Sequence, residues 1–266
     1  MDYFDKAETW DRATLETVQL ARLKTTIQQA GRAPFYAKRL AEAGVSADNL
    51  RSLEDIRRIP FTSKDDLRSQ YPYGLATVPH SEFVRMHCSS GTTGTPVAVC
   101  YTQPDINSWA DLMARCLYMA GVRKDDVFQN MSGYGLFTGG LGIHFGAERL
   151  GCMTIPAGAG NSKRQLKLVK DFGTTVAHIL PSYALHLGTT LIEEGEDPKA
   201  LSLRIACVGA EPYTEETRRR IEALFDMKVY NSYGLSEMNG PGVAFERQYQ
   251  NGLHLWEDAY LLEIID

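Results

Sequence analysis

A loop rich in serine, threonine and glycine is the part of this sequence best suited to chemistry. It comprises Ser89, Ser90, Gly91, Thr92, Thr93, Gly94, Thr95 and Pro96. Glycine lets backbone amides approach a ligand closely, and consecutive amides in such a turn form an anion-binding concavity. The hydroxyl groups add donors, so the loop suits a polyphosphate. No lysine follows the second glycine, which excludes a Walker A loop, and a plain surface turn is the less favoured alternative because apolar segments flank the loop.

Two further segments carry groups that a nucleotide site needs. The first contains Asn231, Ser232, Tyr233, Gly234, Ser236 and Glu237. Its ring offers a flat face to a purine, its hydroxyl groups can donate to phosphate, and its carboxylate is a suitable ligand for Mg²⁺. The second contains Gly209, Ala210, Glu211 and Pro212, directly after an apolar stretch. Because ligands of parallel α/β sheets lie beyond the carboxyl ends of strands, both segments are candidates for such a site.

The elements that must position these segments alternate between helix and strand. Residues 1–80 are predicted to be mostly helical, with helices at 14–30 and 34–43 and capped helix starts at Ser52 and at Thr62 or Ser63. Strands at 83–88 and 97–101 flank the first loop as a hairpin. Further helices are predicted at 105–120, 165–172, 183–194 and 215–225, and strands at 126–131, 150–156, 176–180, 203–208 and 228–231. This alternation predicts an α/β core with a largely parallel sheet over residues 81–266.

The composition is that of a soluble globular protein. The chain has 266 residues, a formal net charge of −5 and 44% hydrophobic residues. The basic runs Arg57-Arg58 and Arg218-Arg219-Arg220 lie beside acids and are interpreted as solvated helix faces, which argues against a nucleic-acid-binding protein. No stretch approaches the ~20 apolar residues of a membrane span. Five cysteines without paired spacing indicate reduced thiols, and we expect a cytoplasmic protein.

Several other residues have simple structural explanations. His254 with Glu257 and Glu246 offers ligands for a metal, but a surface strand with incidental acids is favoured on ligand count. His178 lies between apolar neighbours and is interpreted as a satisfied core residue. A helical spacing indicates core positions for Trp109, Met113 and Leu117.

Taken together, the motifs resemble those of the adenylate-forming superfamily, the acyl-CoA synthetases and their relatives. Residues 89–96 resemble its phosphate loop, and residues 230–237 resemble its adenine and magnesium motif. Likeness to the phenylacetate–CoA ligase branch lies in residues 133–140, 209–212, 240–244 and 252–258. The motifs occur in the expected order over nearly the whole chain, so the resemblance implies the N-terminal domain of that fold.

The resemblance also implies a two-step reaction. A carboxylate attacks the α-phosphate of ATP to give an acyl-adenylate and pyrophosphate, and the thiol of coenzyme A then displaces AMP. ATP, Mg²⁺ and coenzyme A are therefore the expected cofactor and co-substrates, and an aromatic carboxylic acid is the expected substrate. No nucleic acid or membrane partner is implied. A homodimer is one option, because dimers are common in this branch.

Residue roles follow from the same resemblance. The β and γ phosphates are assigned to Ser90, Gly91, Thr92, Thr93 and Gly94. The adenine is assigned to Gly209, Ala210, Glu211, Pro212 and a stacked Tyr233. Nucleotide binding more generally is assigned to Ser89, Asn231, Ser232 and Gly234. The catalytic residues are Thr92, Ser236, which contacts the α-phosphate, and Glu237, which ligates Mg²⁺. The acyl pocket is assigned to Tyr134, Phe137, Gly139 and Gly209.

Two departures from the family pattern affect the expected activity. Thr95 stands where the family usually has lysine, and the loss of a charge-assisted contact weakens ATP binding by about 1–3 kcal/mol. The family's ribose-binding aspartate, hinge and C-terminal domain would lie beyond Asp266, where Leu261–Asp266 has the pattern of a strand. We expect a truncated N-terminal part with weak or no activity. The alternatives are a non-catalytic nucleotide-binding or interaction module and another adenylating ligase of the superfamily.

Overall fold

The structure, a computed structural model, describes residues 3–89 and 94–265, which form two compact units. The first unit consists of Asn107–Leu255 with the N-terminal residues up to Phe4, and the second consists of Asp5–Ile106 with the residues from Trp256 onward. These units divide the chain at other positions than residue 80. The domain boundary that the sequence predicts there stays a prediction.

The described residues form helices and short strands in alternation. The α-helices are α1 (Arg12–Ala30), α2 (Pro34–Glu42), α3 (Lys64–Ser69), α4 (Gln103–Met119), α5 (Thr138–Leu150), α6 (Ser162–Phe172), α7 (Pro181–Glu193) and α8 (Glu215–Phe225). The strands are β1 (Phe83–Cys88), β2 (Ala98–Thr102), β3 (Val127–Asn130), β4 (Met153–Ile155), β5 (Val176–Ile179), β6 (Ile205–Val208), β7 (Lys228–Leu235), β8 (Gly240–Glu246) and β9 (Leu253–Leu255). Short 3₁₀ helices are η1 (Lys6–Thr9), η2 (Ala47–Asn49), η3 (Leu53–Arg58), η4 (His80–Glu82), η5 (Pro198–Ala200) and η6 (Ser236–Met238).

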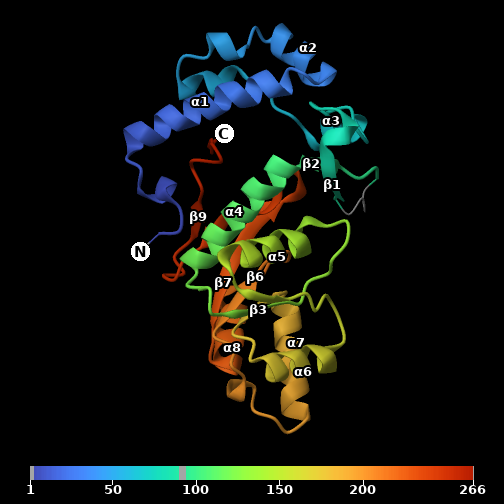
Figure 1. Cartoon of the computed structure of the whole chain (residues 1–266), viewed down its shortest axis with the longest axis vertical. Coiled ribbons are helices and arrows are strands. Elements are labelled where there is room, and N and C mark those ends of the chain that lie inside the picture. Colours follow the sequence, from blue (N-terminus) through green and yellow to red (C-terminus); the bar gives the residue numbers. More distant parts are fainter. Residues whose placement is uncertain (1–2, 90–93, 266) are drawn as a thin grey trace. The chain divides into compact units, whose positions relative to one another are not determined.

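The first unit is built on a seven-stranded sheet with the strand order β4-β3-β5-β6-β7-β8-β9 (Figure 1). The pairs from β4 to β7 are parallel, and β8 and β9 extend the sheet as antiparallel strands. Helices connect the parallel strands, because parallel neighbours need a crossover connection rather than a tight turn. The predicted α/β class with a largely parallel sheet is therefore confirmed.

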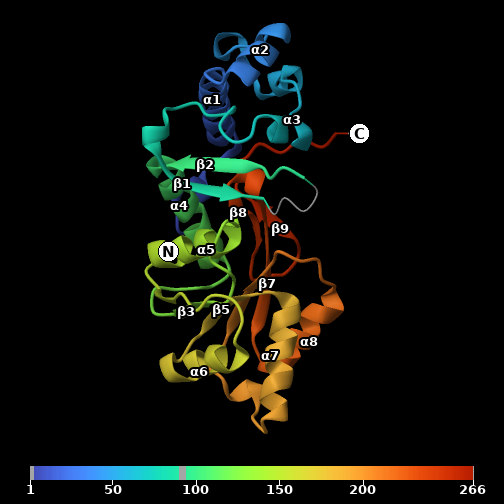
Figure 2. The ribbon, with the colours of Figure 1, turned by 90° about the vertical axis from the view of Figure 1, so that its right-hand side faces the viewer.

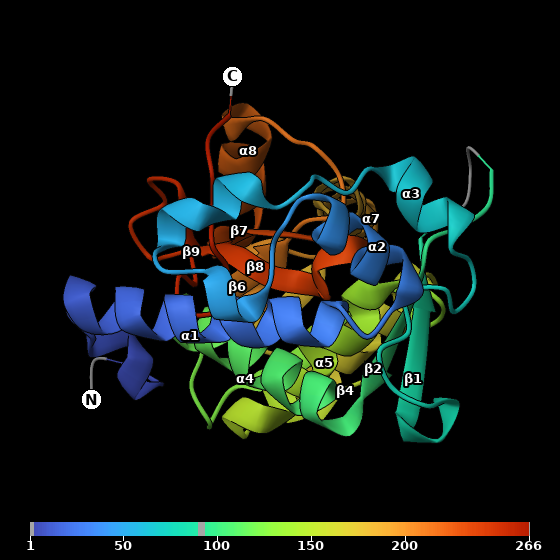
Figure 3. The ribbon, with the colours of Figure 1, turned by 90° about the horizontal axis from the view of Figure 1, so that it is seen from above.

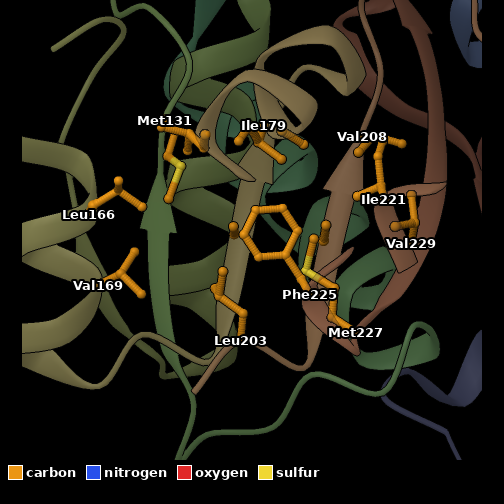
Figure 4. Close-up of a cluster of buried hydrophobic side chains, with 14 of the residues drawn as sticks. Met131, Leu166, Val169, Ile179, Leu203, Val208, Ile221, Phe225, Met227 and Val229 are labelled. Carbon is orange, nitrogen blue, oxygen red and sulfur yellow. The ribbon is translucent and has the colours of Figure 1, made fainter. Parts of the chain in front are cut away.

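One face of this sheet packs against α6, α7 and α8 (Figure 4). Alternate strand residues point to this face, so that Ala177 and Ile179 of β5 and Ala206 and Val208 of β6 join the same cluster. The helices contribute Leu166, Val169, Ala184, Leu187, Leu191, Ile221 and Phe225. The burial of these side chains fixes α6, α7 and α8 against the parallel strands.

The helix pair α4 and α5 is packed very closely. A Cβ atom at Gly146 would lie 2.3 Å from Cβ of Met113, which leaves room only for glycine at this position of α5. The side chains of Trp109, Met113 and Leu117 are all buried, which confirms the predicted core positions. The indole N–H of Trp109 also donates to the carbonyl of Pro241 over 2.7 Å and so links α4 to β8.

In the second unit, α1, α2 and the short helices that follow them lie together (Figure 3). They share a small apolar core. Its buried members are Ile27, Leu40, Val45 and Leu50. Helix α3 begins at the predicted cap, because the hydroxyl of Ser63 accepts from the amide of Asp66. The residues after Trp256 also belong to this unit: the guanidinium of Arg12 lies 2.9 Å from the carboxylate of Glu257.

Strands β1 and β2 form the predicted antiparallel hairpin (Figure 2). Met86 pairs with Cys100, and the pairing continues to Cys88 opposite Ala98. The loop of residues 89–96, called the phosphate-type loop below, begins there. The loop residues Ser90, Gly91, Thr92 and Thr93 lie outside the described residues.

Some sequence expectations are wrong. Leu261–Ile265 forms no strand, since no described strand pairs with it to satisfy its amides, and Ile264 is 94% exposed. The capped start at Ser52 leads into the 3₁₀ helix η3 rather than an α-helix. Arg218 and Glu246, interpreted as solvated or surface residues, are only 5% and 3% exposed.

Two further expectations concern the cysteines and membrane spans. All five cysteines are free, in agreement with their unpaired spacing. Over residues 3–89 and 94–265, no helix has both the length and the apolar character needed to cross a membrane.

A buried carboxylate joins three parallel strands at their amino ends. Asp126, just before β3, accepts from Nε of Arg204 over 2.9 Å and from the hydroxyl of Thr175 over 2.7 Å. The amide of Arg123 donates to the same carboxylate over 2.7 Å. Burial raises the pKa of Asp126, but the hydrogen bonds from Arg204, Thr175 and Arg123 outweigh it and hold the pKa below its ordinary value of 3.8. Ionised Asp126 therefore stabilises the folded state.

We predict that Asp126→Asn lowers the free energy of unfolding by about 2 kcal/mol at neutral pH. Because the folded pKa lies below the unfolded one, this stabilisation is present above pH ~4 and is lost as the pH falls through the folded pKa. Urea unfolding should therefore show a deficit that shrinks toward pH ~3. Asp125→Asn, at the exposed neighbouring position, is the control and should change little. An equal deficit at both pH values would contradict the assignment.

Candidate functional site

The candidate residues of the first unit follow neighbouring strand ends. In the sheet register, Asn130 of β3 lies beside His178 of β5, and Val208 of β6 lies beside Asn231 of β7. Segments that follow these positions therefore extend beyond the parallel part of the sheet at the same edge. They are residues 132–139 after β3, residues 209–212 after β6 and residues 231–237 at the end of β7. This is the carboxyl edge, where parallel α/β sheets place their ligands.

Two of these segments touch at Gly209. A Cβ atom at this position would lie 2.6 Å from Oγ of Ser232 and 2.8 Å from its carbonyl oxygen. Only glycine permits this approach, so the turn after β6 lies directly against the end of β7. We call these two stretches, residues 209–212 and 231–237, the nucleotide-type segments. The next residue, Ala210, has a φ of 66°, which is unusual for a residue with a side chain. Such backbone outliers concentrate at functional sites.

Glu211 has a structural partner at this edge. Its carboxylate accepts from the amide of Ser182 over 2.6 Å and from the hydroxyl of Ser182 over 3.0 Å. Ser182 lies in the first turn of α7, where the helix dipole favours a negative charge. Glu211 therefore anchors the 209–212 turn to α7, a contact that the sequence analysis did not foresee.

The segment after Asn231 continues β7 into a tight pairing with β8. A Cβ atom at Gly234 would lie 2.0 Å from the carbonyl oxygen of Gly240. Tyr233 is 50% exposed, so one part of its ring is accessible. Ser236 and Glu237 are half-buried in the short helix η6 that follows. An aromatic ring, a hydroxyl and a carboxylate thus follow one another along a rigid turn.

Three of the predicted acyl-pocket residues, Tyr134, Phe137 and Gly139, lie in or just before the first part of α5. The phenol of Tyr134 lies 3.1 Å from Nδ1 of His144, and burial raises the pKa of this phenol. Phe137 directly precedes α5 and is 58% exposed. A Cβ atom at Gly139 would meet no atom within 4 Å, so space is open beside the first turn of α5. Gly209 belongs to the same sheet edge through β6.

A buried polar pair lies at the carboxyl ends of β3 and β5. Nδ1 of His178 is 2.9 Å from Oδ1 of Asn130, and the amide group of Asn130 donates to the carbonyl of Gly140 over 2.8 Å. Burial lowers the pKa of His178 to about 4, so the ring is neutral near pH ~7. His178 is confirmed as a satisfied core residue. Asn130 was missed, although a polar residue at the end of an apolar strand was the available signal.

The described flanks of the phosphate-type loop belong to the second unit. The amide of Ser89 donates to the carbonyl of Val97, and the hydroxyl of Ser89 accepts from the amide of Val97, both over 2.9 Å. Ser89 therefore closes the base of the loop. Gly94 has a φ of 132°, and Thr95 is exposed.

We predict that Gly209→Ala lowers the free energy of unfolding by about 1–3 kcal/mol, because the added methyl group overlaps with Ser232. Urea unfolding of the purified variant measures this change. Gly135→Ala is the matched control, since a Cβ atom at Gly135 would meet nothing within 4 Å. Equal stability of the two variants would contradict the close contact between the segments.

Comparisons with known proteins show which family the chain belongs to. Residues 16–258 match the model of a family described as AMP-binding enzyme. The chain is 47% identical, over 98% of its length, to phenylacetate–coenzyme A ligase of Pseudomonas putida, and 46% identical, over 100%, to that of Thermus thermophilus. It spans about 60% of the length of each of these relatives.

A solved structure gives the same answer. The structure of 2-hydroxyisobutyryl-CoA ligase in complex with 2-HIB-AMP and CoA superposes with a TM-score of 0.90 at 31% identity. The match covers 97% of this chain and 57% of that one. Nearly the whole length of this chain thus aligns with part of an acyl-CoA ligase. On these grounds the chain belongs to the AMP-binding enzyme family and is similar throughout its length to phenylacetate–CoA ligases.

Proposed function

We propose that this chain provides the nucleotide- and acyl-binding part of an ATP-dependent acid–CoA ligase whose substrate is an aromatic carboxylic acid. The observation that carries the proposal is the contact between the turn at Gly209 and the segment at Ser232. This contact unites the two nucleotide-type segments at the edge where the loop before α5 also ends. The similarity to phenylacetate–CoA ligases supports the same assignment.

In this proposal the adenine lies against the ring of Tyr233 and the backbone of the 209–212 turn. The exposed half of the ring suits a purine face. Ser236 then donates to the α-phosphate, where negative charge grows as the carboxylate oxygen attacks phosphorus and the bond to pyrophosphate breaks. A donor held in place before the reaction stabilises that charge without reorganisation. The contacts of residues 90–94 with the β and γ phosphates are taken from the family resemblance alone.

Glu237 is the residue that would hold Mg²⁺. Its carboxylate is a hard oxygen donor on a half-buried turn, which fits the preference of this ion. Among the residues that the structure describes, no group of three or more His, Cys, Asp or Glu could hold a metal ion. Phosphate and water oxygens would therefore complete the coordination, as is usual for Mg²⁺. The ion would neutralise charge on the phosphates.

The acyl group is proposed to lie beside Tyr134, Phe137 and Gly139. Two aromatic rings and the open space at Gly139 suit a flat aryl group. In the second step the thiol of coenzyme A would attack the acyl carbonyl carbon, with AMP as the leaving group. These residues would bind and orient the acid but take no part in proton transfer.

The second candidate function is a non-catalytic nucleotide-binding module. The exposed Thr95 favours it, because this position supplies no cation to the phosphates. Acid-dependent release of pyrophosphate from ATP separates the two candidates. A ligase part releases pyrophosphate only when the acid is present, whereas a non-catalytic module binds ATP without that release.

We predict saturable binding of ATP with Mg²⁺ to this chain, measured by isothermal titration calorimetry. A variant with Glu237→Ala and Thr93→Ala should bind at least about 100-fold more weakly, since it loses the metal ligand and a phosphate donor. Glu216→Ala, which removes an exposed glutamate from α8, is the control and should bind as the unaltered chain does.

The outcomes are distinct. Binding that the double variant loses and the control keeps supports the proposed site. A folded chain that shows no saturable binding, or a double variant that binds like the control, contradicts it.

A further inference from the structure

Strand β7 has to change partners just where the nucleotide-type segment begins. On one side it pairs with β6 as far as Asn231, opposite Val208. On the other side its pairing with β8 begins only at Ser232, opposite Phe245. The backbone groups of Val229 and Asn231 on that second side therefore have no strand partner. Buried backbone groups must be satisfied, so side chains have to take over.

Arg218 of α8 and Glu246 of β8 fill this gap as a buried ion pair. Nη2 of Arg218 donates to Oε1 of Glu246 over 3.1 Å, and Nη1 donates to Oε2 over 2.5 Å. The same Nη1 donates to the carbonyl of Val229 over 3.1 Å, while Oε2 of Glu246 accepts from the amide of Asn231 over 2.9 Å. The pair thus binds one backbone group of each residue. Two other side chains assist at Val229, where Nε2 of Gln250 donates to the same carbonyl over 2.9 Å and the amide donates to Glu222 over 3.0 Å.

The ion pair also reaches the other nucleotide-type segment. The guanidinium carbon of Arg218 lies 5.8 Å from the ring centre of Tyr213, in a cation–π contact. Tyr213 directly follows the turn of residues 209–212. One buried guanidinium therefore contacts both segments, one through Glu246 and the other through Tyr213.

The charges and geometry suit a rigid link. Both side chains are about 5% exposed, so water competes little with their hydrogen bonds. The planar guanidinium donates two bonds to the carboxylate in a fixed orientation, which a lysine could not reproduce. Burial alone would lower the pKa of Arg218, but the hydrogen bonds that Arg218 donates to Glu246 raise this pKa above its ordinary value, and the guanidinium stays charged.

From this geometry we infer that Arg218 and Glu246 are positioning residues for nucleotide binding. They set the spacing between the turn at residues 209–212 and the segment at residues 231–237. They touch no nucleotide in this account, and they act through Asn231 and Tyr213. The inference rests on the proposed function for its ligand but not for its structural part, and the two are tested separately below.

The test is Glu246→Gln, which keeps the shape of the side chain and removes its charge. We predict an ATP dissociation constant about tenfold higher, because displaced binding groups lose affinity steeply with small shifts. Independently of any nucleotide, hydrogen exchange measured by NMR should become faster at the amide of Asn231 and at its neighbours in residues 229–235. Exchange in β5 and β6 should change much less.

Asp126→Asn is the matched control, because it removes the charge of another buried carboxylate at the opposite edge of the same sheet. It should lower stability but leave ATP affinity unchanged. Its hydrogen exchange should show no selective loss of protection at Asn231 and in residues 229–235. If Glu246→Gln does not fold, the double variant Arg218→Met with Glu246→Leu removes both charges and avoids an unpaired buried one. It should likewise speed exchange at Asn231.

The possible results separate the two claims. Local loss of protection with weaker ATP binding supports the positioning role. Uniform acceleration across all strands with unchanged affinity overturns it, because that is the result of a general loss of stability. If the unaltered chain binds no ATP, the proposed function fails, while the exchange pattern alone still supports or overturns the link to Asn231.

Discussion

The structure of the first unit depends on one constraint, which is that β7 must pair in parallel with one neighbour and antiparallel with the other. Its first half is a parallel strand beside β6, and its second half is an antiparallel strand beside β8. Backbone amides and carbonyls cannot be left unsatisfied where these pairings change. The ion pair of Arg218 and Glu246, together with Glu222 and Gln250, meets this requirement. The end of β7 can therefore leave the parallel register and carry Tyr233 and Glu237 beyond the ends of the parallel strands, where we propose that the nucleotide binds.

The two edges of the parallel sheet are built by different chemistry. At the amino edge, Asp126 binds Arg204 and Thr175 and holds three strands together with charge. At the carboxyl edge, glycines bring segments into direct contact, as at Gly209 and Ser232. Small residues at that edge leave backbone groups and open space accessible to a ligand. The charged contacts that stabilise the fold and the proposed binding site thus lie at opposite ends of the same strands.

Much of the fold could be predicted from local sequence patterns. Helix α8 coincides with the predicted range of residues 215–225. Helix α3 begins after Ser63, one of the two cap residues that the sequence predicts. Short-range rules suffice in such cases, because periodicity and capping depend on neighbours within a few residues. The candidate site segments were also found from residue types, since the glycine-rich turn and the aromatic–carboxylate segment are local motifs.

The remaining features depend on contacts between distant residues. Arg218 belongs to a run of three arginines, and only the position of Glu246 in the fold makes the first of them a buried residue. The partnership of Glu211 with Ser182 and that of Asn130 with His178 join residues 29 and 48 positions apart. The strand expected at Leu261–Ile265 failed for the opposite reason, since an apolar pattern forms a strand only beside a partner.

The most direct test of the account is photolabelling of this chain with 8-azido-ATP in the presence of Mg²⁺, followed by peptide mapping. The azide is attached to the adenine, so it labels whatever lies beside the base. If the nucleotide binds at the carboxyl edge of the sheet, the label appears on the peptides that contain residues 209–213 and 230–237, and unlabelled ATP protects them. Competed labelling confined to other peptides, such as those of α6 or α1, would contradict the placement of the nucleotide at the carboxyl edge of the sheet.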